Sequence, residues 1–219
     1  MSNRTTTARG SEQLIERFFY KERNGWPNMD PQKLLEVIQV QRHDFLNHLQ
    51  VVSGYLQLNK PDRMREYIDK IIADMRVMSQ TAWLEIPEVT AALLVGFNEA
   101  AKHQIEMELA VQAKLDQCAV PGTVVGFALE KALCCFFENL SPPDLSKRKL
   151  AVSFEENQEQ YTICLSRQAA CIADPLLLKK DLKPVKELLS PHGGASNIAL
   201  SGDKLEIFLE IPRKRAENG

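Results

Sequence analysis

The chain has 219 residues, of which 44% are hydrophobic and 26% are charged, and its formal net charge at pH 7 is -2. That length and apolar content suit one or two small globular domains. The charge balance lacks the excess of basic residues that is typical of nucleic-acid-binding proteins. No apolar run approaches the roughly 20 residues that a membrane-spanning helix needs. We therefore expect neither a nucleic-acid partner nor a membrane segment.

The cysteines and the N-terminal residues bear on the compartment. Five cysteines, an odd number without CxxC spacing, occur mostly among apolar residues: Cys118, Cys134, Cys135, Cys164 and Cys171. This pattern indicates buried thiols in a reducing environment. The polar start, Met1 to Gly10, does not have the composition of a signal peptide. A cytoplasmic location is expected.

Residues 1–30 are expected to form an N-terminal extension. Residues 1–10 are expected to be disordered. Ser11 to Glu22 has apolar residues at helical spacing and predicts an accessory helix, which the break Gly25-Trp26-Pro27-Asn28 ends.

Residues 31–83 predict two antiparallel helices. The first has an apolar seam at alternating steps of three and four, interrupted by Arg42: Leu35, Ile38, Phe45, Leu49, Val52 and Leu56. Pro61 breaks the helix, and Asp62 is expected to cap the next one. The second helix carries its own seam: Met64, Ile68, Ile71, Met75 and Met78. Two helices cannot bury both seams alone, so we expect a homodimer in which two hairpins form a four-helix bundle.

A second, polar stripe on the first helix carries the candidate chemistry. It runs along one face, away from the seam, through His43, Asn47, Gln50, Gly54 and Gln57. Asp44 adjoins His43, and Asn47 lies on the same face as His43 because the two are four residues apart. A neutral imidazole is a good nucleophile toward an activated phosphoryl group. An ordinary surface histidine is the alternative for His43, and it is the favoured interpretation of His48, His103 and His192.

Residues 87–213 predict a second domain that mixes helices and strands, joined to the hairpin by a linker near Trp83 to Glu88. The expected elements are, in order, a helix over Pro87 to Lys102, a strand over Ile105 to Val111, a largely apolar helix over Pro121 to Leu140, a β-hairpin formed by Leu150 to Glu155 and Tyr161 to Ser166, a weakly helical segment over Leu176 to Leu189, and a final strand over Leu205 to Ile211. The predicted fold class is α+β.

The segment Val40 to Arg76, with its run RHDFLNHLQVVSGYLQL, resembles the α-hairpin of the sporulation initiation phosphotransferase B family, which is shared with citrate/fumarate-type sensor histidine kinases. The resemblance implies that His43 is the phospho-acceptor. From the residues themselves we expect that Asp44 polarises or orients the ring, that Arg42 and Asn47 contact the transferring group, and that Gln50 and Gly54 face the partner. The element order of residues 87–213 resembles a shortened histidine-kinase ATPase domain, an α/β sandwich with helices on one face.

The nucleotide-binding residues of such a domain are absent. In the best register, Glu130 and Cys134 stand at the polar positions of the helix that carries a Mg²⁺-binding asparagine in the kinases. Where those kinases have Asp-x-Gly-x-Gly, this chain has Arg167, Ala169 and Cys171, and glycine is needed where the backbone must approach a ligand closely. The pair Gly193-Gly194 is a turn rather than a second glycine box. We expect no cofactor on this chain, with Mg²⁺ supplied by the partner.

The resemblance thus implies a phosphorelay phosphotransferase that takes a phosphoryl group from the aspartyl phosphate of one response regulator onto His43 and passes it to another, in sporulation initiation. Two alternatives remain open. One is an ATP-dependent sensor histidine kinase of the citrate/fumarate type, and the other is a non-catalytic dimeric scaffold that binds response regulators.

Overall fold

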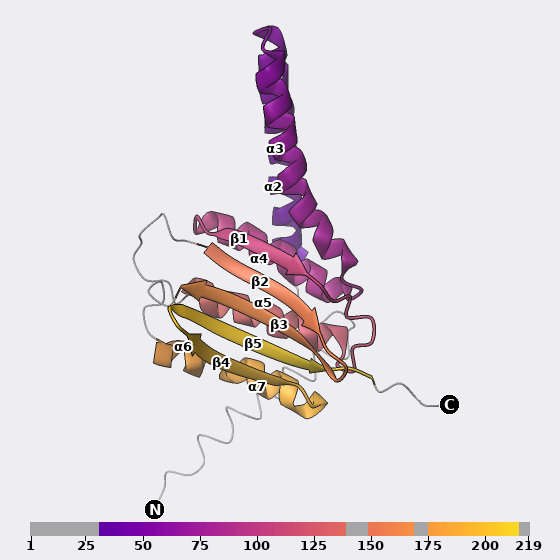
Figure 1. Cartoon of the computed structure of the whole chain (residues 1–219), viewed down its shortest axis with the longest axis vertical. Helices are drawn as coiled ribbons and strands as arrows, with labels where there is room; N and C mark the ends of the chain where they lie inside the picture. The colour runs from indigo at the N-terminus through magenta and orange to yellow at the C-terminus, as the bar shows by residue number, and fades with distance from the viewer. Residues whose placement is uncertain (1–30, 139–148, 169–174, 215–219) are drawn as a thin grey trace, which may run out of the picture.

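The computed structural model describes residues 31–138, 149–168 and 175–214. In these residues a helical arm projects from a C-terminal domain that contains the β-sheet (Figure 1). The arm consists of α2 (Pro31–Gln57) and α3 (Pro61–Gln80). The predictions for residues 1–10 and for a helix over Ser11 to Glu22 lie outside the described residues.

A tight turn joins α2 to α3 at the tip of the arm. Asn59 has a φ of 51°, in the left-handed region, and the amide of Lys60 donates to the carbonyl oxygen of Tyr55 at 2.9 Å. The break at Pro61 is therefore confirmed. The prediction that Asp62 caps α3 was wrong, because Lys60 precedes the helix and no side chain caps it. Asp62 lies instead in the first turn, where a negative charge favours the helix dipole.

The two helices of the arm contact each other along a row of α2 that shares only Val52 with the predicted seam. His48, Val52 and Tyr55 are half-buried on α2, and the imidazole of His48 contacts Tyr67 of α3. Five of the six predicted seam residues are exposed, with exposed fractions of 49–68%: Leu35, Ile38, Phe45, Leu49 and Leu56. The chain by itself thus leaves an apolar stripe on α2 open.

The C-terminal domain is built on a mixed five-stranded sheet. Its strands are β1 (Glu106–Val111), β2 (Lys149–Glu156), β3 (Gln160–Gln168), β4 (Ala195–Ser201) and β5 (Lys204–Pro212). They lie in the order β1-β2-β3-β5-β4, and only β1 and β2 are parallel. A parallel pair needs a crossover, and the helix α5 lies in the connection from β1 to β2.

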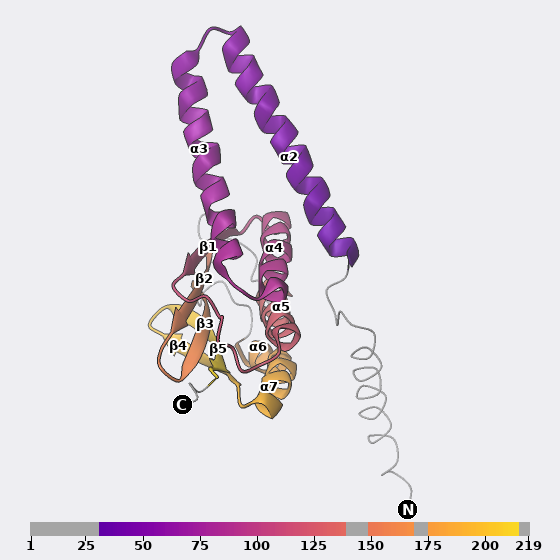
Figure 2. The same cartoon turned by 90° about the vertical axis from the view of Figure 1, so that its right-hand side faces the viewer.

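Helices cover one face of this sheet (Figure 2). They are α4 (Pro87–Lys102), α5 (Gly122–Glu138), α6 (Pro175–Asp181) and α7 (Lys183–Leu189). Alternate residues of β3 and β5 are buried beneath them, as expected for a sheet with one covered face. The helices α4 and α5 pack closely, because a Cβ at Gly126 would lie 2.7 Å from the carbonyl oxygen of Glu88. This packing makes α5 the central helix of the core.

The α+β fold class is confirmed, and most predicted elements lie within a few residues of their observed bounds. The helix over Pro87 to Lys102 was predicted with its observed ends. Two features were missed. The strand β4 was not predicted, and the segment before it forms two helices that meet at Leu182, together with the short 3₁₀ helix Ser190–His192. Gly193, with a φ of 77°, forms the predicted turn before β4.

Among the described residues, no helix is both long enough and apolar enough to cross a membrane.

Candidate functional site

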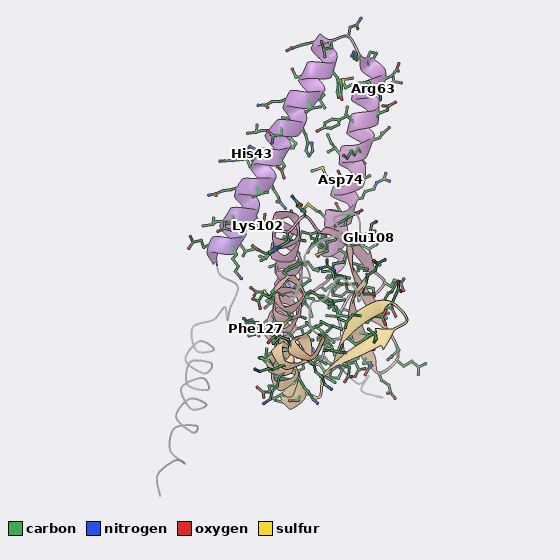
Figure 3. All side chains as sticks on the ribbon, turned by 90° about the vertical axis from the view of Figure 1, so that its left-hand side faces the viewer. His43, Arg63, Asp74, Lys102, Glu108 and Phe127 are labelled. Carbon is green, nitrogen blue, oxygen red and sulfur yellow. The ribbon has the colours of Figure 1, made fainter. Side chains whose placement is uncertain are left out.

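His43 lies midway along α2, on the arm and away from the sheet (Figure 3). Its side chain is 73% exposed. The exposure follows from the sequence, because the hairpin contact uses the row of His48 and Val52, whereas His43 belongs to the polar stripe. A protein approaching the arm from outside therefore meets the imidazole directly.

Two neighbours hold the Nδ1 atom of the imidazole. The side-chain amide nitrogen of Asn47 lies 3.1 Å from Nδ1, and the Oδ1 atom of Asp44 lies 3.5 Å from it. Asn47 reaches the ring from one helical turn further along the same face. The adjacent Asp44 reaches it sideways and is 58% exposed.

The contacts at Nδ1 decide which ring nitrogen is nucleophilic. If Nε2 carries the proton, Nδ1 accepts a hydrogen bond from the amide of Asn47. If Nδ1 carries the proton, it points toward Asp44 and toward Asn47 with its amide turned by 180°, which places the amide oxygen next to it. In that second tautomer the Nε2 lone pair is directed away from both neighbours. Asp44 favours this tautomer, because a carboxylate attracts an N–H and repels a lone pair.

The other predicted site residues lie around His43 in different ways. Gln50 and Gly54 continue its face along α2, since helix positions seven and eleven residues apart nearly coincide around the axis. A Cβ built on Gly54 would meet nothing within 4 Å, so the face is open there. Arg42 is exposed but lies about 100° around the helix from His43. The structure therefore brings Asp44 and Asn47 to the imidazole, whereas Arg42, Gln50 and Gly54 flank it.

His48 has a structural environment, unlike His43. Its Nδ1 atom lies 2.9 Å from the hydroxyl of Tyr67, inside the hairpin, and Tyr67 also packs edge-on against Tyr55. His103 ends α4 and stacks on Phe137 at 5.9 Å. The role of Tyr67 as the partner of His48 has no local sequence signal, because the two residues belong to different helices.

The positions assigned to a nucleotide site have other neighbours in this chain. The carboxylate of Glu130, on α5, forms an ion pair with Lys33 of α2 at 2.7 Å. Burial raises the pKa of the neighbouring Cys134 thiol, and the Glu130 carboxylate adds to that rise. Arg167 is buried near the end of β3. Ala169 and Cys171, which stand where the kinases have glycines, lie outside the described residues.

Within residues 31–138, 149–168 and 175–214, no three His, Cys, Asp or Glu side chains come together as a metal ion would require.

The residue that sequence reasoning missed is Lys33. Its partner lies 97 residues away, and no local pattern identifies so distant a contact.

Comparison with known proteins agrees with this architecture. Residues 27–84 match the family described as Sensor_kinase_SpoOB-type, alpha-helical domain. The sensor protein CitS of Halalkalibacterium halodurans is 25% identical over 139 residues, which make up 58% of this chain and 24% of that protein. Sporulation initiation phosphotransferase B of Bacillus subtilis is 24% identical over 143 residues, which make up 65% of this chain and 73% of that protein.

Solved structures include a histidine kinase from Burkholderia phymatum, at 12% identity and a TM-score of 0.48, covering 84% of this chain and 96% of that one. The chain spans about a quarter of the length of CitS and about three quarters of that of the phosphotransferase.

The hairpin, residues 27–84, is thus similar to the SpoOB-type alpha-helical domain, and the chain as a whole is similar to a sporulation initiation phosphotransferase.

Proposed function

We propose that this chain is a phosphorelay phosphotransferase. It accepts a phosphoryl group from the aspartyl phosphate of one response regulator onto His43 and passes it to a second regulator. The observation that carries the proposal is the exposed imidazole on a SpoOB-type hairpin, with Asn47 and Asp44 both placed at Nδ1. The similarity to a sporulation initiation phosphotransferase supports a role in the same process.

The proposed step uses the lone pair of Nε2. It attacks phosphorus, a new N–P bond forms, and the P–O bond to the donor aspartate breaks, leaving a carboxylate on the donor. The ring then carries a positive charge shared with its Nδ1–H, next to Asp44. The second transfer reverses these events onto another aspartate. Phosphoryl transfer depends mainly on alignment and charge neutralisation, so the role of this chain is to present the ring.

Mg²⁺ is assigned to the regulator in this proposal. A transferring phosphoryl group needs its charge neutralised, and an acidic pocket around the donor aspartate can hold the ion. Arg42 and Asn47 would contact the transferring group from this side, while Gln50 and Gly54 would contact the regulator.

The proposal includes a homodimer. The exposed stripe on α2 contains Leu35, Ile38, Phe45, Leu49 and Leu56, and an apolar stripe at this spacing is typical of a bundle interface. A second arm packed against it would cover these residues and complete a four-helix bundle. His43 would remain outside, and the two-fold symmetry would present two equivalent sites.

An ATP-dependent histidine kinase is the second candidate, and the similarity to the sensor protein CitS favours it. Against it, Glu130 on α5 already has a partner in Lys33. Calorimetry with ATP and Mg²⁺ separates the two. The phosphotransferase proposal expects no saturable binding, and micromolar binding with labelling of the chain by ATP would favour the kinase.

Transfer from a response regulator is the direct test of the proposal. The regulator is phosphorylated beforehand, freed of ATP and mixed with this chain. We expect the labelled phosphoryl group to move from the regulator to this chain after mixing, and then to a second regulator when that protein is added. A scaffold would bind the regulators without acquiring label.

A further inference from the structure

Glu130 is buried, at 8% exposure, in the helix at the centre of the core. An ionised carboxylate is costly to bury unless it is paired. Its partner, Lys33, comes from the first turns of α2, the helix that also carries His43. The pair therefore ties the arm to the core of the C-terminal domain.

A second set of contacts strengthens the same junction. Lys102, at the end of α4, bonds Glu36 of α2 at 3.3 Å and Glu99 of its own helix at 2.8 Å. Val37, next to Glu36, is 4% exposed and is the one buried residue of α2 among its described side chains. The base of α2, with Val37 buried, is thus held by ion pairs to two neighbouring helices, α4 and α5.

The other helix of the arm is held at its C-terminal end, where α3 continues into the 3₁₀ helix Thr81–Trp83 and the carbonyl oxygen of the buried Thr81 accepts a hydrogen bond from the hydroxyl of Thr90 on α4. No residue of α3 is fully buried, and the upper part of α2 exposes its apolar stripe. Figure 3 shows the arm standing clear of the C-terminal domain beyond Lys102, with His43 on the free part. The orientation of the imidazole relative to the C-terminal domain thus depends on two anchors, the end of α3 and the base of α2, and the base of α2 belongs to the helix that carries His43.

We propose that Lys33 and Glu130 are positioning residues that hold α2 on the C-terminal domain and thereby set the orientation of His43 for a protein partner. This inference rests on the proposed phosphotransfer. Hydrogen bonding to Glu130 also raises the pKa of Lys33 above its ordinary value of 10.5, so Lys33 stays charged at neutral pH.

The distances indicate that the anchoring of α2 affects phosphoryl transfer from a protein donor but not from a small-molecule donor. His43 lies about 15 Å further along the axis of α2 than Lys33, at the rise of an α-helix. A standard interface covers about 800 Å² on each partner, which corresponds to a patch about 16 Å in radius. A regulator docked on His43 therefore covers the arm down to the level of the ion pair between Lys33 and Glu130. Phosphoramidate, a small phosphoryl donor, needs access only to the imidazole ring.

The test uses Lys33→Met and Glu130→Gln in the full chain, with Lys149→Met as the matched control. Lys149 also pairs with carboxylates, Glu106 and Glu108, but in an exposed cluster at the edge of the sheet. The double variant Lys33→Glu with Glu130→Lys restores the pair in reverse. Each protein is examined by hydrogen exchange, by labelling of His43 with phosphoramidate, and by transfer from a phosphorylated regulator.

We expect the amides of residues 34–41 to exchange about tenfold faster in both single variants, because a broken buried pair favours local opening. Transfer from the regulator should fall about tenfold, as expected when alignment is lost. Labelling by phosphoramidate should stay unchanged, and Lys149→Met should behave like the wild type. Recovery of both properties in the double variant would support direct pairing.

Three results would overturn the inference. They are unchanged exchange and transfer in the single variants, equal effects in Lys149→Met, or a parallel loss of phosphoramidate labelling. If the wild-type protein accepts no phosphoryl group from any regulator, the proposed function fails. Hydrogen exchange alone then decides whether Lys33 and Glu130 anchor α2 on the C-terminal domain.

Discussion

Two histidines five positions apart on one helix show how neighbours decide chemistry. His43 is open to solvent, with Asn47 and Asp44 at Nδ1. The Nδ1 atom of His48 instead meets the hydroxyl of Tyr67 inside the hairpin. An imidazole that is already bonded between two helices is poorly placed to meet a phosphoryl group on another protein. The proposed acceptor role therefore belongs to His43.

Replacing His48 by Gln should affect stability and leave chemistry nearly unchanged. The loss of one hydrogen bond costs about 1 kcal/mol, equivalent to roughly 2–4 °C in the melting temperature of a chain of this size. Tyr67→Phe should have a similar effect, because it removes the other half of the same contact. Thermal melts and regulator transfer on both variants check this. Transfer abolished in His48→Gln with an unchanged melting temperature would reverse the assignment of the two histidines.

Cys135 should be inert to alkylation at neutral pH. Burial raises the pKa of its thiol to about 12, and the thiolate is the reactive form. The folded chain therefore keeps this proton at pH values where the unfolded chain loses it. The corresponding stability is fully present below pH 9 and declines as the pH rises toward 12. Iodoacetamide labelling at pH 8, followed by mass spectrometry, should modify Cys135 only after unfolding. Rapid labelling of the native protein would contradict the assigned burial.

At the scale of single elements, α2 presents different faces to different partners. One row contacts α3, the apolar stripe is open for a second copy, and the polar face carries His43. Three different faces on one helix allow docking and dimerisation to be disturbed separately by substitution.

Gly54→Tyr should weaken regulator transfer without unfolding the arm. A side chain at this position meets no atom within 4 Å, and replacing Gly inside a helix favours helix formation. A ring on the face of His43 would nonetheless block a close approach. Transfer rates and melting temperatures measured on the same protein test this. Unchanged transfer, or loss only in step with unfolding, would mean that the regulator docks elsewhere.

Leu49→Asp should dissociate the proposed dimer. Leu49 is 49% exposed in the single chain, so a charge there is tolerated by a monomer. In the bundle it would be buried without a partner, at a cost of several kcal/mol. Light scattering at micromolar concentration should show a dimer for the wild type and a monomer for the variant. A monomeric wild type would refute the bundle.

Sequence reasoning found the helices and strands with strong periodicity, and its failures have physical causes. On α2 it identified the regular apolar seam, of which only Val52 lies in the contact within the hairpin. The contact also uses His48 and Tyr55, because the polar group of His48 pairs with Tyr67 across the helices. The strand β4 has the sequence ASNIALS, with one β-branched residue, and it is specified by its pairing with β5 rather than by propensity.

The candidate site was predicted only as far as its parts are local. Asn47 and Asp44 lie within one turn of His43, so helical spacing places them at the ring. The anchoring of α2 involves Lys33 and Glu130, which are 97 residues apart. Spacing says nothing about such a pair, because the fold of the C-terminal domain brings it together.

On the scale of the whole molecule, the chain combines a projecting arm with a domain that supports it. The C-terminal domain holds the base of α2 through Lys33, Glu36 and Val37. In the proposed dimer, the two arms form the bundle and each carries one exposed imidazole. Under the proposed function, the C-terminal domain supports the helix that carries His43, and the phosphoryl group would come from a partner protein.

The most direct test of this account is transfer of radiolabelled phosphate from a phosphorylated response regulator, in the absence of ATP, to the wild-type protein and to His43→Gln. We predict an acid-labile label on the wild type, located at His43 by mass spectrometry, and no label on the variant. Since the side chain of His43 is 73% exposed, the variant should keep its melting temperature. Normal labelling of His43→Gln, or labelling of the wild type by ATP alone, would contradict the account.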